Sequence, residues 1–345
     1  MAEPGEPLAG YTTLRLGGPA RRLVHACSRE RLVEAVRDAD RNDEPVLLLA
    51  GGSNLVVSDD GFPGTVVRIE TRGVEVQDAG PAGVRVTVEA GEPWDGFVSR
   101  AVEEGWVGVE ALSGIPGSVG ATPIQNVGAY GQEVAETIVS VRCWDRAQGQ
   151  QAEIPAVECG FGYRTSRFKR DPGRFLVLAV VFAFDRGRLG APVRYAELAR
   201  RLGAESGQRV PLEDVRRTVL ALRAGKGMVL DPDDHDTWSA GSFFTNPLLD
   251  GDQADRLPDD APRWPQPDGT VKTSAAWLIE RAGFSKGYGD GPAALSGKHT
   301  LALTNRGEAT TADLLELAGR IRTRVQDRFG IVLVNEPVLV GCELH

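Results

Sequence analysis

Long apolar runs are missing from this chain of 345 residues. No stretch approaches the roughly 18 consecutive apolar residues that indicate a membrane span, and the acidic start, residues 1–7, lacks the apolar centre of a secretory signal. The four cysteines, Cys27, Cys143, Cys159 and Cys342, form no CxxC pair. This spacing disfavours the common redox and zinc motifs, and the simplest inference is a reducing compartment. We therefore expect a cytoplasmic protein without a membrane partner.

Positive charge is also scarce. The net charge is −9, and only five of the 39 basic residues are lysines: Lys169, Lys226, Lys272, Lys286 and Lys298. An acidic chain lacks the basic surface of a general nucleic-acid binder, so we expect no nucleic-acid partner. A local basic pocket for a phosphorylated small molecule remains compatible with this balance.

Several catalytic motifs are absent. The chain has no G-x-x-x-x-G-K-[ST] phosphate loop, no H-E-x-x-H and no G-x-G-x-x-G after a predicted strand. Residues 283–287 match G-x-S-x-G, but they follow a helical pattern and not a strand, so we interpret the match as chance. The four histidines show no metal-ligand spacing. Metal catalysis and Ser-His-Asp chemistry are therefore disfavoured, and we expect no metal.

Hydrophobic periodicity and capping residues predict a mixture of helices and strands. At roughly 100–200 residues per domain, the length suggests two or three domains. The predicted helices begin after Ser28, cover Trp94–Glu104 and 211–226, begin near Ser274, and run from the capping-box-like Thr310 to Gly330. The predicted strands are Pro45–Ala50, Thr65–Ile69, Gly73–Gln77, Val84–Glu89, Ile138–Asp145, Phe175–Phe184, Ile331–Val334 and Val338–Val340.

Glycine is the one residue type in clear excess, at 42 residues or about 12 % of the chain, against about 7 % on average. Gly51-Gly52-Ser53-Asn54 follows a predicted buried strand. Successive glycine N–H groups can form a concave anion site that holds a diphosphate. A plain turn between strand and loop explains the same four residues, and taken alone it is the better explanation.

The segment 112–131 carries a stronger signal. Five glycines alternate there with apolar residues, a composition typical of neither a linker, a helix nor a strand. We favour a buried backbone path against a flat ligand, with Gln125 and Asn126 bonding a heterocycle's edge. A tightly packed structural crossover is the alternative.

Three single residues stand in unusual surroundings. Arg164 lies among aromatic and glycine residues, and its guanidinium suits a carboxylate or phosphate. Ser242 is a small hydroxyl between Gly241 and two phenylalanines. Glu336 lies between two predicted apolar strands, where burial would raise the pKa of its carboxyl group. A surface charge, a strand residue and a paired or exposed carboxylate are the plain alternatives for Arg164, Ser242 and Glu336.

Together these motifs resemble the UDP-N-acetylenolpyruvoylglucosamine reductase family, in the family's order and over residues 11–341. The segments that carry the resemblance are AGGSNL at 50–55, SGIPGSVGATPIQNVGAYG at 113–131, GYRTSRFK at 162–169, GSFFTNP at 241–247 and NEPVLVG at 335–341. The stretch around Tyr195 looks like the form of the family with an extra tyrosine-bearing segment.

The resemblance implies an α+β fold: an FAD-binding module of the vanillyl-alcohol-oxidase type, made of two α/β subdomains, followed by a C-terminal α/β substrate domain. We expect the first subdomain at 1–70, with 331–345 returning to it, the second at 71–210 and the substrate domain at 211–330.

The resemblance also assigns roles residue by residue. It implies that Arg164, Ser242 and Glu336 are catalytic, with Arg164 on the substrate carboxylate, Ser242 as proton donor and Glu336 completing the site. The implied substrate-binding residues are Tyr163, Tyr195, Lys226 and Asn246. The implied FAD-binding residues are Gly51, Gly52, Ser53, Asn54, Ile115, Pro116, Gly117, Ser118, Gly120, Ala121, Ile124, Gln125, Asn126, Gly128, Ala129 and Tyr130.

The implied reaction is the NADPH-dependent, FAD-mediated reduction of UDP-N-acetylglucosamine enolpyruvate to UDP-N-acetylmuramate, in peptidoglycan precursor synthesis. The only partner expected is this small-molecule substrate, and we expect a monomer. The sequence departs from the family at two places: Thr245 stands where members often have lysine, and Asn335 stands where proline often precedes the terminal glutamate.

Two other functions fit parts of the pattern. A related FAD-dependent sugar or alcohol oxidase would often attach its flavin through histidine or cysteine, and neither residue occurs in the two glycine segments. A catalytically inactive UDP-sugar-binding protein would not need Arg164, Ser242 and Glu336 together.

Overall fold

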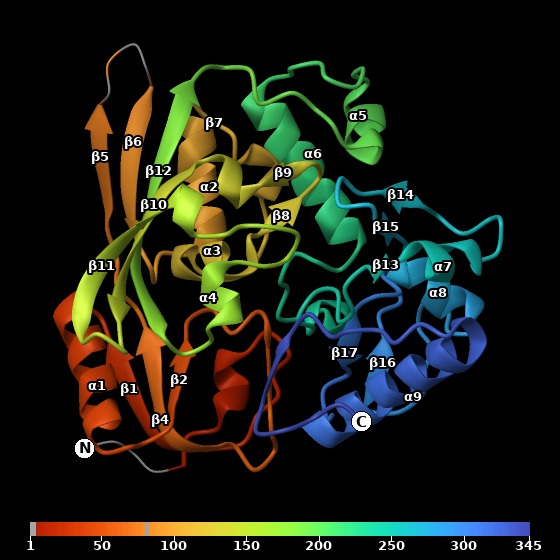
Figure 1. Ribbon diagram of the computed structural model, residues 1–345, viewed down its shortest axis with the longest axis horizontal. Coiled ribbons are helices and arrows are strands. Elements are labelled where there is room, and N and C mark those ends of the chain that lie inside the picture. Colours follow the sequence, from red (N-terminus) through yellow and green to blue (C-terminus); the bar gives the residue numbers. More distant parts are fainter. Residues whose placement is uncertain (1–4, 79, 81–82) are drawn as a thin grey trace. The chain divides into compact units, whose positions relative to one another are not determined.

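The computed structural model describes residues 5–78, 80 and 83–345, which form two compact units (Figure 1). The first unit contains residues 22–51 and 63–224. The second contains residues 5–21, 52–62 and 225–345. Each unit is therefore built from segments that are distant in the sequence, and each is described separately below.

The smaller sheet of the first unit has the strand order β1-β4-β2, with β2 and β4 parallel. Its strands are β1 (Ala20–Ala26), β2 (Val46–Leu49) and β4 (Phe62–Ile69). Helix α1 (Arg29–Arg41) begins after Ser28, whose side chain accepts a hydrogen bond from the N–H of Arg31. Leu32 and Val36 of α1 are fully buried in a cluster with strand residues. The helix predicted after Ser28 is confirmed.

The larger sheet is antiparallel, with the order β11-β10-β12-β6-β5 (Figure 1). Helix α2 (Trp94–Glu103) buries Trp94 and Phe97, and Phe97 stacks on Phe182 of β12 with ring centroids 5.3 Å apart. The strands are β5 (Val74–Asp78), β6 (Val84–Glu89), β10 (Ile138–Asp145), β11 (Gln150–Pro155) and β12 (Phe175–Arg186), with β7 (Trp106–Val107) paired to β12. The predicted strands in this region are confirmed, whereas β7 and β11 were not predicted.

Helix α6 (Leu212–Gly225) closes the first unit. Its predicted apolar stripe is confirmed, because Val215, Val219 and Leu222 pack in a cluster with Leu198 of α5 (Ala196–Leu202). The remaining elements of this unit are short: α3 (Thr122–Gln125), α4 (Arg167–Arg170), β8 (Gly128–Ala129), β9 (Gln132–Glu133) and the 3-10 helices Glu110–Leu112, Val119–Ala121, Val134–Glu136 and Ala156–Glu158.

The second unit is organised around helix α9 (Thr311–Phe329). Thr310 and Asp313 form the predicted capping box, and Gly330 ends the helix with a φ of +69°. Helix α9 buries Leu314, Leu317 and Ile321 in the core of the unit. The other elements are α7 (Gly251–Asp255), α8 (Ala275–Arg281), β3 (Leu55–Val57), β13 (Leu248–Leu249), β14 (Trp264–Pro265), β15 (Val271–Lys272), β16 (Ala293–Leu295), β17 (Leu303–Asn305), β18 (Val338–Val340) and the 3-10 helices Leu8–Tyr11 and His235–Thr237.

The end of the chain differs in part from the prediction. Strand β18 is confirmed and pairs in parallel with β3. The strand predicted at Ile331–Val334 is wrong, because this segment has no continuous ladder partner. Instead, Thr245 donates its N–H to the carbonyl of Val334 at 3.0 Å and Glu336 donates to the carbonyl of Phe243 at 2.8 Å. Isolated bonds of this kind hold the segment against residues 243–245 without forming a strand.

Candidate active site

The Gly51–Asn54 loop follows β2, as predicted, and its glycines are required by contacts within the chain. A Cβ atom on Gly51 would lie 2.6 Å from Cα of Gly117, so the two predicted glycine segments meet backbone to backbone. Gly52 has a φ of +57°, and a Cβ atom there would lie 1.9 Å from the carbonyl oxygen of Tyr11. The absence of side chains at both positions therefore has a packing reason, independent of any ligand.

Gly52→Ala is expected to lower the free energy of unfolding by at least about 2 kcal/mol. The left-handed backbone conformation alone costs an L-residue roughly 1–2 kcal/mol, and displacing Tyr11 adds to this cost. Gly10→Ala is the matched control, because Gly10 is exposed and a Cβ atom there meets nothing within 4 Å. Urea denaturation of the two variants would measure the difference, and equal midpoints would contradict the packing argument.

The segment 112–131 contains more regular structure than its composition predicts. The expectation of neither helix nor strand is wrong, because the 3-10 helix at Val119–Ala121 continues into α3 and the short strand β8 follows. These elements are too short to give a periodic signal. A Cβ atom on Gly120 would lie 2.5 Å from Cβ of Ala90, so this glycine also permits close packing.

Polar side chains in this segment connect it to its neighbours. Asn126 has a φ of +44°, and its amide nitrogen donates to Glu133 at 2.8 Å and to the carbonyl of Gly162 at 3.1 Å. Gln125 accepts a hydrogen bond from Nζ of Lys169 at 2.8 Å. Both amides therefore contribute to holding the loops together.

Arg164 lies where these loops converge. Its Nη2 donates to the carbonyl of Gly128 at 3.0 Å, and its own carbonyl accepts from Nζ of Lys169 at 3.1 Å. Its φ is +51°, in the left-handed region. Asn126, Tyr130 and Arg164 are three of the five described non-glycine residues with positive φ, and all three were predicted as site residues. Strained backbone of this kind clusters at functional sites, which supports a functional role for this region.

Two tyrosines of the first unit also meet. The rings of Tyr130 and Tyr195 pack edge to face with centroids 5.5 Å apart, and both Tyr195 and Tyr163 are exposed. Nearby, Arg223 is only 8 % exposed. Burial lowers the pKa of Arg223 to about 10, while Tyr130 and Asp95 act in the opposite direction and Arg164 adds to the lowering. The guanidinium of Arg223 stays cationic near pH 7.

In the second unit, Ser242 lies next to the segment that carries Glu336. Phe243 and Phe244, which follow Ser242, are both buried, and the carbonyl of Phe243 accepts from the N–H of Glu336 at 2.8 Å. The carbonyl of Glu336 also accepts from the side-chain amide of Asn54 at 3.4 Å. Three predicted site residues, Asn54, Ser242 and Glu336, are thus brought together across long stretches of sequence.

The surroundings of Glu336 differ from the prediction. Val334 and Val338 are 62 % and 49 % exposed, so the two valines do not bury its carboxylate. Val338 is exposed although it begins strand β18, so the exposure does not depend on the missing strand at 331–334. The order Asn335-Glu336-Pro337 forms a local turn in which Nδ2 of Asn335 donates to the carbonyl of Pro337 at 2.8 Å.

Asn246 and Lys226, also in the second unit, lie at the ends of helices. The Oδ1 atom of Asn246 accepts from the N–H of Ala275 at 3.0 Å, at the first residue of α8. Lys226 directly follows the end of α6 and is half-buried. The side chain of Asn246 therefore has a structural contact in addition to its predicted role.

Residues 20–154 match the family model described as FAD binding domain, and residues 231–340 match the C-terminal domain of UDP-N-acetylenolpyruvoylglucosamine reductase. The reductase of that name from Thermobifida fusca is 57 % identical over 98 % of both chains. The one from Streptomyces avermitilis is 58 % identical over 98 % of this chain and 94 % of its own. This chain belongs to the UDP-N-acetylenolpyruvoylglucosamine reductase family.

A solved structure of a reductase with this name is also similar to this chain over nearly its full length. The crystal structure of UDP-N-acetylenolpyruvylglucosamine reductase from Thermus caldophilus is 28 % identical, covers 99 % of each chain and has a TM-score of 0.63. The predicted α+β class and FAD-binding module are confirmed, and the protein is a flavin-dependent oxidoreductase with FAD as cofactor.

One observation within the chain fits a bound flavin. The Oγ atom of Ser118 is buried and has no hydrogen-bond partner among the described residues. Buried polar groups are almost always hydrogen-bonded, so an orphaned hydroxyl in a predicted cofactor loop is suited to a ligand atom. FAD, with its many acceptor atoms, would be held there by Ser118 and the adjoining backbone.

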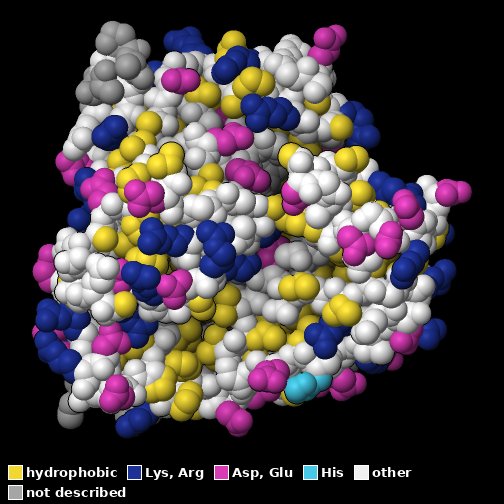
Figure 2. Space-filling model, viewed as in Figure 1, with side chains coloured by type: hydrophobic (Ala, Val, Ile, Leu, Met, Phe, Trp, Pro, Cys, Tyr) yellow, Lys and Arg dark blue, Asp and Glu magenta, His cyan; other side chains and the backbone are white. Residues whose placement is uncertain are grey.

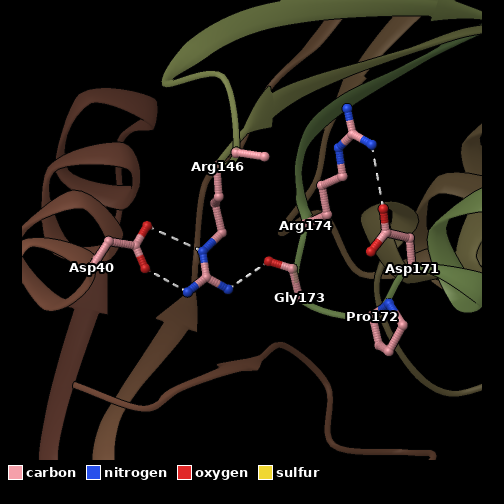
Figure 3. A pocket seen from close by; sticks show the side chains of 7 residues that line it. Asp40, Arg146, Asp171, Pro172, Gly173 and Arg174 are labelled. Atoms are coloured by element: carbon pink, nitrogen blue, oxygen red, sulfur yellow. Dashed lines mark hydrogen bonds and ion pairs between the residues drawn. The ribbon is translucent and has the colours of Figure 1, made fainter. Parts of the chain in front are cut away.

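The first unit also has a hollow of about 570 Å³ that is lined by none of the predicted site residues. Arg146 is paired with Asp40 and donates to the carbonyl of Gly173, and Arg174 is paired with Asp171 at 3.4 Å (Figure 3). The chain therefore compensates the charges of both guanidinium groups. The lining residues are Asp40, Arg146, Ala147, Asp171, Pro172, Gly173 and Arg174, and none was predicted as a site residue.

The surface carries charges of both signs. On the face shown in Figure 2, Lys and Arg side chains are interspersed with Asp and Glu. Within residues 5–78, 80 and 83–345, no helix has the length and apolar character needed to cross a membrane. No group of three or more His, Cys, Asp or Glu side chains in the same residues is arranged to hold a metal ion.

Neither Arg223 of the first unit nor His299 of the second was predicted as a site residue. Arg223 directly follows Leu222, the last residue of the apolar stripe of α6. In a sequence, an arginine near the end of a helix is normally interpreted as exposed to solvent. His299 lies 3.5 Å from Ser242, measured between Nε2 and Oγ, although 57 positions separate the two residues. No short sequence pattern predicts that Arg223 is buried or that His299 lies beside Ser242.

Proposed function

We propose that this protein catalyses the NADPH-dependent, FAD-mediated reduction of UDP-N-acetylglucosamine enolpyruvate to UDP-N-acetylmuramate in peptidoglycan precursor synthesis. The observation that carries the proposal is the 57–58 % identity, over nearly the whole chain, to proteins named as reductases of this enolpyruvyl compound. When bound, FAD supplies the redox chemistry, by which reducing equivalents from NADPH reach the β carbon of the enolpyruvyl group.

In this proposal, Arg164 binds the substrate carboxylate. Addition of hydride to the β carbon leaves negative charge on the α carbon and the carboxylate. A guanidinium that is already fixed stabilises such charge without reorganising during the reaction. The bonds that Arg164 makes to Gly128 and Lys169 support this pre-organisation.

Ser242 then gives its hydroxyl proton to the α carbon, and Glu336 completes the site. A serine hydroxyl is a weak acid, so it requires a strongly basic, carbanion-like acceptor and a source that returns its proton. The proximity of the Ser242 and Glu336 segments, through the backbone bond from Glu336 to Phe243, supports a shared role.

The other site residues have binding roles in this proposal. Tyr195, Lys226 and Asn246 hold the diphosphate end of the substrate, and Tyr163 lies beside the flavin and the substrate. The residues of 51–54 and 115–130 predicted above bind FAD. We further propose a cytoplasmic monomer, with a substrate domain at 211–330 and FAD-binding subdomains at 1–70, including 331–345, and at 71–210.

An anaerobic spectrum tests the function directly. The purified protein is expected to be yellow from bound flavin, and NADPH should bleach it. Adding the enolpyruvyl substrate should then restore the colour, whereas UDP-N-acetylglucosamine, which lacks the enolpyruvyl group, should not. Bleaching without substrate-specific recovery would reject the reductase function and favour a different flavoenzyme.

A further inference from the structure

His299 is placed beside Ser242 by the backbone. Its Nε2 lies 3.5 Å from Oγ of Ser242, and both residues are half-buried. The N–H of Phe243 donates to the carbonyl of Leu301 at 2.8 Å, which joins the residue after Ser242 to the turn that contains His299. The contact between the two side chains is therefore supported by a backbone bond alongside it.

The turn that carries His299 is itself tightly closed. It connects β16 with β17, and the N–H of Ala302 donates to the carbonyl of His299 at 3.1 Å. The N–H of Ser296 donates in turn to the carbonyl of Ala302 at 2.8 Å. These bonds fix the backbone on both sides of the imidazole.

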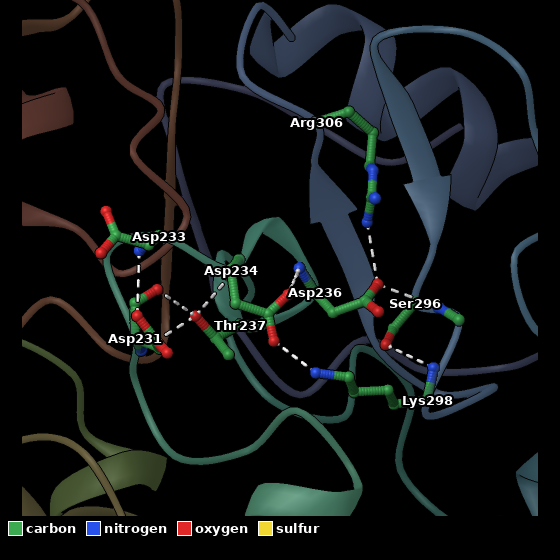
Figure 4. Close-up of polar contacts among 9 residues, drawn as sticks. Asp231, Asp233, Asp234, Asp236, Thr237, Ser296, Lys298 and Arg306 are labelled. Atoms are coloured by element: carbon green, nitrogen blue, oxygen red, sulfur yellow. Dashed lines mark hydrogen bonds and ion pairs between the residues drawn. The ribbon is translucent and has the colours of Figure 1, made fainter.

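Two aspartates hold the turn from the other side. Asp236 accepts from the N–H of Gly297 at 2.9 Å, and Asp234 forms an ion pair with Lys298 (Figure 4). The hydrogen bond from Lys298 lowers the pKa of Asp234. Arg306 also donates to Asp236 at 2.8 Å. The two residues before His299 are thus held in place, which fixes the backbone from which its side chain extends toward Ser242.

The chemistry of Ser242 requires such a neighbour. Once its hydroxyl proton moves to the α carbon of the substrate, its oxygen must regain a proton before the next turnover. Imidazole is the side chain whose ordinary pKa allows it both to carry and to release a proton near pH 7.

We propose that His299 positions the Ser242 hydroxyl and returns its proton. As the O–H bond of Ser242 breaks and the new C–H bond forms, the Nε2–H bond of His299 breaks and the proton passes to Oγ. In this step the group that gives up the proton is the imidazolium cation of His299, which becomes a neutral imidazole and then regains its proton from solvent. This inference rests on the proposed role of Ser242 as proton donor.

The two half-reactions test the inference separately. His299→Ala and His299→Gln should each slow substrate-dependent flavin reoxidation by about 10- to 100-fold, measured by anaerobic stopped flow, and leave reduction by NADPH unchanged. Glutamine keeps a hydrogen-bonding group near Oγ but cannot exchange a proton, so it should not rescue the rate. His345→Gln, at the exposed end of the chain, is the matched control.

A double variant decides whether His299 acts through Ser242. In a Ser242→Ala background, His299→Ala should change reoxidation by less than about 2-fold, because residues that act as one unit are not additive. Full additivity, rescue by glutamine, or equal slowing of both half-reactions would each overturn the inference. If the wild type is not reoxidised by substrate, the proposed function itself fails; if only the His299 variants behave as wild type, the inference alone fails.

Discussion

Ser242→Ala should slow reoxidation of the reduced flavin by the enolpyruvyl substrate at least about 100-fold, while reduction by NADPH stays unchanged. The size follows from the loss of a positioned proton donor, since proton transfer by such groups contributes about 10²–10⁴ in rate. The effect is confined to one half-reaction because only the second one forms a C–H bond at the α carbon. Single-turnover anaerobic stopped flow separates the two rates.

The matched control for Ser242 is Ser285→Ala. Ser285 belongs to the same unit, is exposed, and lies in the G-x-S-x-G match that we interpreted as chance. The structure supports that interpretation, because the residues follow helix α8 and not a strand. Ser285→Ala should therefore leave both half-reactions unchanged. If Ser242→Ala slowed both half-reactions equally, Ser242 would matter for folding or flavin binding and not as a proton donor.

Arg164→Gly should lower kcat/KM by about 10²–10³-fold without a comparable loss of stability. Loss of one pre-organised group that stabilises transition-state charge has an effect of this size. Glycine also adopts the left-handed backbone of Arg164 without strain, which offsets the loss of the hydrogen bond to Gly128. Steady-state kinetics and thermal unfolding of the same preparation measure the two quantities.

Arg164→Lys is the informative companion variant. Lysine keeps the positive charge but loses the planar fork that binds a carboxylate through two bonds, so activity should fall between those of the wild type and Arg164→Gly. If Arg164→Gly retained substrate-dependent reoxidation at the wild-type rate, the positive φ at Arg164 would have to be explained by packing alone.

Local structure was largely predictable from the sequence. Ser28 and Thr310 cap their helices as predicted, because N-capping depends on residues only two or three positions apart. The strands Val84–Glu89 and Ile138–Asp145 also follow from short patterns. The prediction of a strand at Ile331–Val334 is wrong, because an apolar run does not show whether a partner strand is available to pair with it.

The candidate site was predictable only in the residues that lie in motifs. The five motifs of the family carry every site residue named from the sequence except Tyr195 and Lys226. The glycine excess, interpreted as a path for a ligand, also has a packing reason at Gly51, Gly52 and Gly120. A glycine in a sequence signals close approach, but it does not say whether the approaching group is a ligand or the chain itself.

The sequence by itself determined the family and, through the resemblance to it, the FAD-binding module, because these depend on residue identity in the motifs. It also determined the four longest described helices and several strands, because these depend on short-range periodicity. Only the tertiary structure decided the contacts between loops: Ser242 with His299, Asn54 with Glu336, and Gly51 with Gly117. The pairs Ser242–His299 and Asn54–Glu336 are 57 and 282 positions apart in the chain. Contacts over such separations arise from the packing of whole elements around a core, and no local pattern encodes them.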